Sequence, residues 1–176
     1  VNITKAYYIV EVNLLAKDTI LNKNVIVKIN NTEKFTGSAS IYPPSIQFNT
    51  DGYIYIASPG SPNGLETLKT EFQYSIDTWY KIALVYHKDS KNVDFYINKQ
   101  PVVTGHTMLG ANCTRIGGIK FQTSNSVGKV SEMMIDDLRL YESDADYNVK
   151  YPPAAKDVTI TANNPARVNE TVTGNY

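Results

Sequence analysis

The strongest constraint on the fold of this chain is a two-residue alternation of apolar and polar side chains that recurs as far as about residue 141. In Tyr53-Ile54-Tyr55-Ile56, for example, the isoleucines share one side of a strand and the tyrosines the other. No segment repeats apolar residues at the 3.6-residue spacing of an amphipathic helix. The pattern therefore predicts an all-β chain.

Turn-forming residues divide this pattern into separate strands. Asn49-Thr50-Asp51-Gly52 is a hairpin signal, and Asp89 to Asn92 is a tight polar reversal. We expect longer loops at 58–64 and 99–112. The expected strands are 6–14, 25–30, 45–48, 53–57, 68–74, 79–87, 93–98, 114–122 and 129–141.

A domain boundary is expected shortly after Tyr141. The sequence turns acidic and then reaches Tyr151-Pro152-Pro153, where prolines have no ladder donor to offer, so this stretch is typical of a linker. Residues 1–148 are expected to form one domain. Residues 149–176 are expected to be a proline-containing linker and the incomplete start of a following module similar to bacterial immunoglobulin-like domains.

Composition narrows the classes of partner. The 17 basic and 17 acidic residues cancel, and a pI near 6.9 gives no field that would gather nucleic acid. No run approaches the roughly 18 apolar residues of a membrane span, so membrane insertion is not expected. The single cysteine, Cys113, cannot form an internal disulfide.

Enzymatic motifs are missing from the sequence. It has only two histidines and no HExxH, GxSxG, P-loop or GxGxxG pattern. A glycosidase needs two facing carboxylates, but the adjacent Asp136 and Asp137 should point to opposite faces of a strand. We therefore expect no catalytic activity.

Several short sequence features between Trp79 and Tyr141 occur in the same order in a known family of domains. Trp79 opens a strand, a polar turn leads to a second strand followed by Asn98, the step Arg115-Ile116-Gly117 follows, and Ile135 to Tyr141 closes the set. Together, over about residues 6–141, they resemble laminin G-like, concanavalin A-like jelly-roll domains. The resemblance implies a two-sheet antiparallel jelly-roll sandwich in which 99–112 crosses between sheets. It also implies binding, mostly of sugars. Trp79 could stack on a sugar, but its place at the start of a central strand in this class favours packing in the core or at an edge.

Sugar binding requires exposed aromatic rings that stack on pyranose faces, surrounded by amides and charged groups that bond hydroxyls. Strand alternation turns several such residues away from the expected core. It does not say which outward face binds, and tyrosines on a sheet also serve to cover apolar surface. The predicted ligand-binding residues are Tyr53, Tyr55, Gln73, His87, Asp94, Tyr96, Asn98, Lys120 and Gln122.

Asp136 suggests a structural calcium ion. If Leu138 and Leu140 face the core, alternation places Asp136 on the same side, where a carboxylate needs a partner. Calcium accepts carboxylate and carbonyl oxygens, and Glu11 is a conceivable second ligand. The alternative is that Asp136 accepts hydrogen bonds from loop amides while Asp137 pairs with Arg139 or with solvent.

These inferences together lead to a functional expectation. The chain is expected to be a non-catalytic carbohydrate-binding module of an exported, multi-modular bacterial protein, either secreted or on the cell surface. Its partners would be a polysaccharide or oligosaccharide and the neighbouring modules of the same protein. The alternative is an adhesin or structural spacer that contacts protein or cell-surface partners, with an enzyme as a third possibility.

Overall fold

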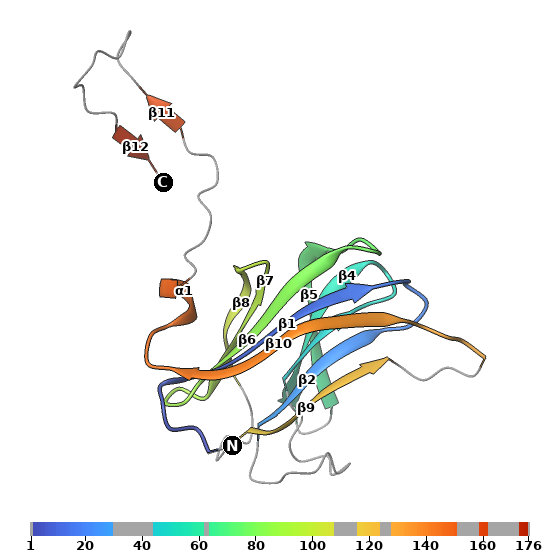
Figure 1. Cartoon of the computed structure of the whole chain (residues 1–176), viewed down its shortest axis with the longest axis horizontal. Helices are drawn as coiled ribbons and strands as arrows, with labels where there is room; N and C mark the ends of the chain where they lie inside the picture. The colour runs from blue at the N-terminus through green and yellow to red at the C-terminus, as the bar shows by residue number, and fades with distance from the viewer. Residues whose placement is uncertain are drawn as a thin grey trace.

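The computed structural model describes residues 2–29, 44–61, 64–107, 116–123, 128–150, 159–161 and 173–175. Across these ranges the chain is almost entirely antiparallel β-structure, and two five-stranded sheets stack as the layers of a sandwich (Figure 1). The all-β prediction is confirmed.

Sheet I joins strands from distant parts of the sequence. Its order is β10 (Met133–Ser143), β1 (Tyr7–Ala16), β6 (Trp79–His87), β7 (Asn92–Ile97) and β8 (Gln100–Thr107). All neighbours are antiparallel. Both β10 and β8 are edge strands.

Sheet II contains the intervening strands, also antiparallel. Its order is β5 (Gly64–Gln73), β4 (Tyr53–Ser61), β3 (Ser45–Phe48), β2 (Lys23–Ile29) and β9 (Ile116–Thr123). Near the end of the chain are a short helix, α1 (Tyr147–Lys150), and a separate pair, β11 (Thr159–Thr161) with β12 (Thr173–Asn175).

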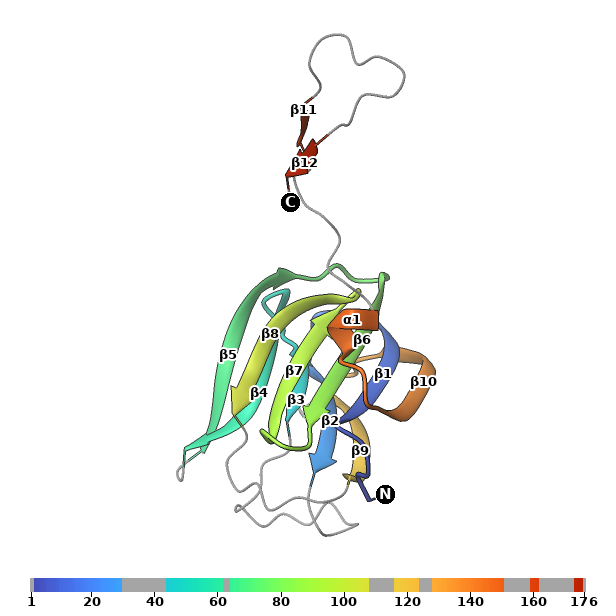
Figure 2. The ribbon, with the colours of Figure 1, turned by 90° about the vertical axis from the view of Figure 1, so that its left-hand side faces the viewer.

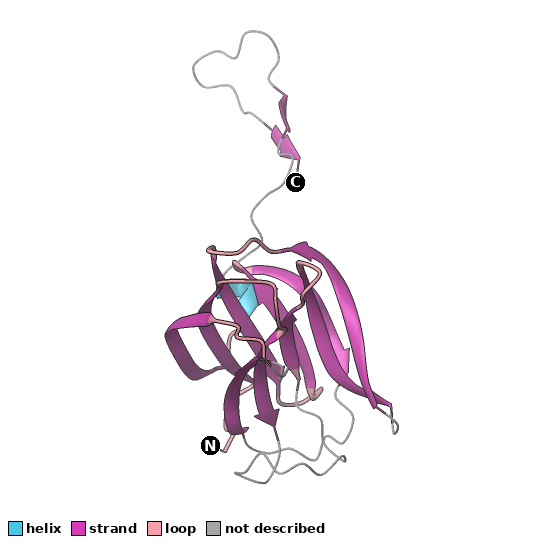
Figure 3. Cartoon of the chain, turned by 90° about the vertical axis from the view of Figure 1, so that its right-hand side faces the viewer, coloured by secondary structure: helices cyan, strands magenta, loops and turns pink. Residues whose placement is uncertain are grey.

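The core lies between the two sheets, and Figure 3 shows that strands make up most of the described chain around it. Alternation sends Ile54 and Ile56 inward from sheet II and Ile82 and Phe95 inward from sheet I, and all four are fully buried. Aromatic rings close one end of this core, where Phe48 meets Tyr74 edge-on at 5.0 Å and Phe72 meets Tyr80 at 5.6 Å. Burial of this apolar surface is the main driving force for the fold, which needs no disulfide.

The predictions of loops at 58–64 and 99–112 are partly wrong. Residues 100–107 form strand β8, because Asn98 and Lys99 adopt positive φ angles of 51° and 68° and reverse the chain directly after β7. Two consecutive positive φ angles are typical of a tight hairpin turn, which Asn tolerates well. The expected loop at 58–64 is also shorter than predicted, since β4 continues to Ser61 and β5 begins at Gly64.

The expectation that Leu138 and Leu140 lie in the core is wrong. Their side chains are 45% and 49% exposed, because β10 is the edge strand of sheet I. The register also shifts between Glu11, which opposes Arg139, and Asn13, which opposes Asp136. This extra residue is a β-bulge at Asp137, whose φ is 51°, and it resets the alternation on which the placement of Asp136 depended.

The short helix α1 packs on the outer face of sheet I. Tyr147 is buried against Ile9, Ala83, Val85 and Tyr96, on the side of the sheet away from the main core. Figure 2 shows α1 in front of the central strands of this sheet. The packed part of the domain therefore extends at least to Tyr147. Among the described residues, none of the helical structure is long and apolar enough to cross a membrane.

Candidate functional site

A row of polar and aromatic side chains crosses the outer face of sheet II. Residues that oppose each other in antiparallel strands share a face, and the register aligns one residue from each of the five strands. We call this set the cross-strand row: Lys69, Tyr55, Gln47, Asn24 and Gln122. With strands about 4.8 Å apart, the row is about 19 Å long. Its members are all at least partly accessible.

Further polar residues flank the cross-strand row on the same face. Tyr53 opposes Gln73, and both lie one tier along from Tyr55 and Lys69. Lys120 is two residues from Gln122 in β9, and Glu71 lies between Lys69 and Gln73 in β5. The predicted residues Tyr53, Tyr55, Gln73, Lys120 and Gln122 are thus brought together on one face.

Sequence reasoning missed three members of the row, namely Asn24, Gln47 and Lys69. The signal for Gln47 was present, because Ile46 and Phe48 on either side are core residues. Asn24 precedes the buried Val25 and is likewise identifiable by alternation. What the sequence lacks is the order of the strands, which alone places these residues beside Tyr55.

Asp51 organises one end of the row from the turn between β3 and β4. Its Oδ2 atom accepts hydrogen bonds from the Tyr55 hydroxyl and the Lys69 ammonium, each at 2.8 Å, and its Oδ1 atom accepts one from the backbone N–H of Tyr53 at 3.1 Å. The Lys69 Nζ atom also lies 3.6 Å from the centre of the Tyr53 ring, within cation–π range. Both tyrosine rings are therefore held in defined positions.

The electrostatics of this cluster follow from the same contacts. The hydrogen bond from Lys69 lowers the pKa of Asp51, and its reciprocal effect raises the pKa of Lys69. The hydrogen bond to Asp51 raises the pKa of Tyr55, so its hydroxyl stays protonated. Asp51 neutralises the charge of Lys69 locally; Glu71, in the same strand as Lys69, is negative, and Lys120 of β9 is positive.

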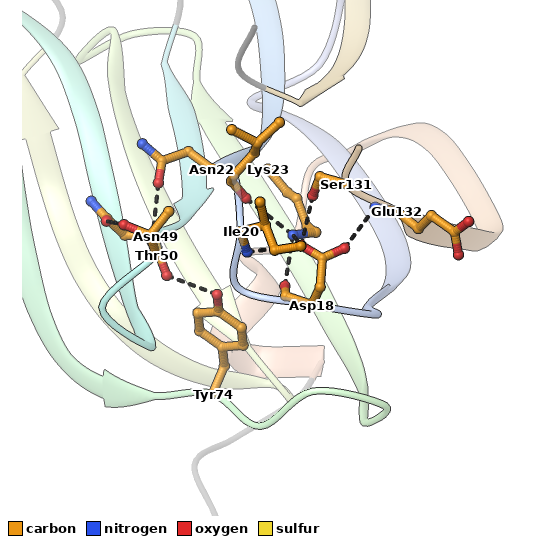
Figure 4. Close-up of polar contacts among 10 residues, drawn as sticks. Asp18, Ile20, Asn22, Lys23, Asn49, Thr50, Tyr74, Ser131 and Glu132 are labelled. Atoms are coloured by element: carbon orange, nitrogen blue, oxygen red, sulfur yellow. Dashed lines mark hydrogen bonds and ion pairs between the residues drawn. The ribbon is translucent and has the colours of Figure 1, made fainter. Parts of the chain in front are cut away.

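The turn that carries Asp51 is fixed by neighbouring segments (Figure 4). The Asn22 Oδ1 atom accepts the backbone N–H of Thr50 at 3.0 Å, and the Tyr74 hydroxyl donates to the Asn49 carbonyl at 2.7 Å. Burial raises the pKa of Tyr74 to about 12, which keeps it a donor. Gly52 supplies the positive φ of 82° that lets the turn close.

A buried lysine holds the adjacent loop. The Lys23 ammonium is fully buried and donates to the Asp18 carbonyl at 2.7 Å, to the Asp18 Oδ1 atom at 3.0 Å and to the Leu21 carbonyl at 3.0 Å (Figure 4). Asp18 also accepts bonds from the Ser131 hydroxyl and the Glu132 N–H, which join the start of β10 to this loop. Desolvation would raise the pKa of Asp18, but these hydrogen bonds outweigh it and hold the pKa far below its usual range. The sequence analysis did not predict this pairing of Lys23 with Asp18.

His87, Asp94 and Tyr96 lie on the other sheet. The His87 Nε2 atom is 2.8 Å from the Asp94 Oδ2 atom, and this hydrogen bond raises the pKa of His87. The backbone N–H of Gly105 donates to the other oxygen of Asp94 at 2.6 Å. Asp94 and Tyr96 are buried, and the Tyr147 ring lies 4.6 Å from that of Tyr96. The expectation that these two side chains form an open surface is corrected: Tyr147 of α1 covers Tyr96, and Asp94 is buried with its oxygens bonded to His87 and Gly105.

Asn98 has a structural task in the β7–β8 turn. Its side-chain Oδ1 atom accepts the backbone N–H of Lys81 at 3.0 Å, and its own N–H donates to the Lys81 carbonyl at 2.7 Å. Although its side chain is exposed, its polar atoms define the turn, and it lies away from the cross-strand row.

The two expected calcium ligands have other partners. Glu11 is 1% exposed, and its carboxylate oxygens accept the Tyr141 hydroxyl at 3.1 Å and the Tyr147 hydroxyl at 2.8 Å. Asp136 is exposed and accepts the N–H of Asp137 at 2.7 Å. In the described part of the chain, no group of three or more His, Cys, Asp or Glu residues could hold a metal ion. Glu11 and Asp136 thus each have protein hydrogen-bond partners, and the structural calcium ion stays a prediction of the sequence.

Comparisons with known proteins identify the fold. No family model matches the chain, and no curated protein matches it. Among solved structures, a sialidase has a TM-score of 0.56 at 15% identity, over 82% of this chain and 14% of the sialidase. Sheep galectin-11 has a TM-score of 0.54 at 12% identity, over 80% of this chain and 93% of the galectin. A pentraxin from Limulus polyphemus has a TM-score of 0.54 at 11% identity, over 97% of this chain and 80% of the pentraxin.

These likenesses confirm the predicted concanavalin A-like jelly-roll sandwich. At such low identity they show the fold alone, and the chain spans only a small part of the sialidase. The chain thus has a lectin-like jelly-roll fold, in which the cross-strand row covers one outer face.

Proposed function

We propose that this chain is a non-catalytic carbohydrate-binding module that recognises a polysaccharide through the outer face of sheet II. The cross-strand row is the observation that carries this proposal. Tyr55 offers a ring to the C–H face of a pyranose, while the amides of Gln47, Asn24 and Gln122 can each donate to one sugar hydroxyl and accept from another. Stacking combined with amide pairing is the chemistry of sugar recognition.

The form of the row favours an extended ligand. Its residues come from five adjacent antiparallel strands and follow one line across them. This line is about 19 Å long, which is four strand spacings of about 4.8 Å. A polysaccharide chain laid across the strands would meet the aromatic end first and the amides in succession.

The charges of the face favour a neutral glycan. The ammonium of Lys69, beside the two tyrosine rings, is paired with the Asp51 carboxylate, and Glu71 of the same strand carries a further negative charge. An anionic polymer would gain little here, because the one cation beside the aromatic rings already has a carboxylate partner at 2.8 Å.

A binding role is favoured over catalysis by the same contacts. Sialidases among the structural neighbours are enzymes by name, but this chain covers only 14% of the first of them. On the face of sheet II, the Asp51 carboxylate accepts hydrogen bonds from Lys69 and Tyr55, which favours a structural role over that of a glycosidase nucleophile or proton donor. The lectin-like fold supports sugar binding in general.

The wider setting is part of the proposal. The module would belong to an exported, multi-modular bacterial protein, secreted or at the cell surface, whose catalytic part is a glycoside hydrolase or polysaccharide lyase. Tethering to the polymer would raise the effective concentration of that catalytic part on its substrate, even if each contact is weak. The alternative is an adhesin or spacer with protein or cell-surface partners.

The test is affinity electrophoresis in gels containing xylan, glucomannan, galactan or polygalacturonate. We expect at least one neutral polysaccharide to retard the domain, and the double variant Tyr55→Ala/Gln47→Ala to lose at least tenfold in affinity. Asp89→Asn, an exposed change in the β6–β7 turn, is the control and should bind normally. If no polysaccharide retards the domain, the spacer alternative is favoured.

A further inference from the structure

The outer face of sheet I is divided into a covered part and an open part. Tyr147 of α1 covers the row that contains Glu11, Ala83 and Tyr96. Beyond it, towards the start of β6, the sheet carries Trp79, whose side chain is 45% exposed. Of the two alternatives expected for this residue, packing in the core is wrong, and its exposure on an outer sheet face is compatible with stacking on a sugar.

The residues around Trp79 make an apolar base with a polar border. Leu15 lies directly between Trp79 and Met134 in the register of three neighbouring strands. Leu15 is buried, so the exposed apolar surface comes from the ring of Trp79 and the side chain of Met134. The next row of the same face holds Asn13, flanked by Lys81 on β6 and Asp136 on β10.

The charged groups of this border are held in place by one another. The Asp137 carboxylate at the β-bulge accepts the Arg139 Nε–H at 2.8 Å, and its other oxygen lies 3.9 Å from the Lys81 Nζ atom. The Asn13 amide makes no side-chain hydrogen bond to any other residue in the described part of the chain. An exposed indole thus lies beside a row that contains an amide, a carboxylate and an ammonium group.

We propose that this surface is a second sugar-contact site, in which Trp79 stacks on a pyranose ring and Asn13, Lys81 and Asp136 bond its hydroxyls. A flat indole with one apolar face to offer and polar groups along its side matches the two kinds of surface on a sugar ring. The ligand class is the same as for sheet II, but the site is separate and lies on the opposite face of the sandwich.

The size of the open surface favours a sugar over a protein partner. It comprises two rows on three strands, about 10 Å across by 7 Å along, because strands lie about 4.8 Å apart and rise about 3.4 Å per residue. A stable protein interface buries about 800 Å² on each partner and has few charges at its centre. Here α1 closes one side, and charged residues adjoin the indole.

Two sites on opposite faces would make the module bivalent. Two polymer chains, or two segments of one chain, would then be held together, and the apparent affinity for a dense polysaccharide would exceed that for a short oligosaccharide. Bivalent binding depends on the proposed function of sheet II. The proposal of a site at Trp79 does not, because it is argued from the residues around Trp79.

Trp79 is the only tryptophan in the sequence, so fluorescence excited at wavelengths that tyrosine does not absorb reports on this residue. The experiment titrates the domain with the hexasaccharides of cellulose, xylan and mannan. We expect at least one of them to shift the emission maximum to the blue and to change its intensity in a saturable way. The same response should persist in Tyr55→Ala/Gln47→Ala, in which the sheet II site is removed.

Two further variants test whether the fluorescence change comes from sugar binding at Trp79. Asn13→Ala keeps the tryptophan and should weaken the fluorescence response at least threefold, while Trp79→Ala should lower the affinity for an insoluble polysaccharide without changing the melting temperature by more than a few degrees. Absence of any spectral change with all three hexasaccharides overturns the second site, whether or not sheet II binds. A change that disappears in Tyr55→Ala/Gln47→Ala also overturns it, since the signal would then originate at sheet II.

Discussion

The two outer faces of this sandwich arise from the same alternation of side chains, but they differ in how accessible their outward residues are. On sheet II the outward side chains remain accessible, and polar groups from all five strands form one continuous row. On sheet I the outward residues Ile9, Val85 and Tyr96 face away from the main core but are buried beneath Tyr147. The comparison shows that facing away from the core does not make a residue available. A four-residue helix from the end of the domain decides which tyrosines can meet a ligand.

The largest expected effect is on the covered face. Tyr147→Ala would leave a cavity over sheet I and remove one of the two described hydrogen bonds to the buried Glu11 carboxylate. Truncation of a buried aromatic residue costs about 4 kcal/mol, so the free energy of unfolding should fall by that order in urea denaturation. Tyr147→Phe should cost less than half as much. Polysaccharide binding through sheet II should be unchanged, and a loss of binding would contradict the independence of the two faces.

A somewhat smaller loss of stability is expected at the loop beside sheet II. Lys23→Met removes the cation from among its oxygen ligands and leaves the partly buried Asp18 carboxylate without its charge partner. Breaking such a pair should destabilise the fold by about 3 kcal/mol. The matched control is Lys5→Met, which breaks an exposed pair with Asp144 and should cost less than about 1 kcal/mol. Equal melting temperatures for the two variants would show that Lys23 is not a structural cation.

Asp51 tests how far the order of the tyrosine cluster matters. Asp51→Ala releases Lys69 and the Tyr55 hydroxyl and should weaken polysaccharide binding about fivefold, or about 1 kcal/mol. Asp51→Asn keeps an acceptor for both groups and should lose less. Because the pKa of Asp51 is lowered, wild-type binding should persist as the pH falls until that carboxylate is protonated. If Asp51→Ala binds as tightly as wild type, the ring positions do not limit affinity.

The smallest expected effect concerns His87 on sheet I. The hydrogen bond to Asp94 raises the pKa of His87, so the folded state binds a proton more tightly than the unfolded state does. The stabilisation is therefore complete below the unfolded pKa of about 6.5 and is lost as the pH rises through the higher folded pKa. Wild type should lose up to about 1 kcal/mol over this window relative to His87→Gln. Parallel pH profiles of the melting temperature for the two proteins would contradict this account.

Some features were accessible from the sequence because they depend on short-range alternation. Tyr53, Tyr55 and Gln122 were correctly placed on an outward face, and the hairpin at Asn49 to Gly52 was correctly located. Alternation works here because each strand has one face on the core. The fold class followed from the same pattern.

Other features were not accessible, because they depend on contacts between distant segments or on local irregularity. The burial of Tyr96 depends on Tyr147, far along the chain. The β-bulge at Asp137 moves Asp136 out of the alternation that was used to place it. Trp79 is exposed because it lies at the start of β6, beyond the part of the outer face that Tyr147 covers.

The central claim is that a polysaccharide binds the outer face of sheet II through the cross-strand row. The most direct measurement is the affinity for one retarding neutral polysaccharide of Tyr55→Ala/Gln47→Ala and of Tyr147→Phe, a conservative change on the covered face of sheet I. The account predicts at least a tenfold loss for the first and less than a twofold change for the second, with both proteins folded by their melting curves. Unchanged affinity in Tyr55→Ala/Gln47→Ala would contradict it.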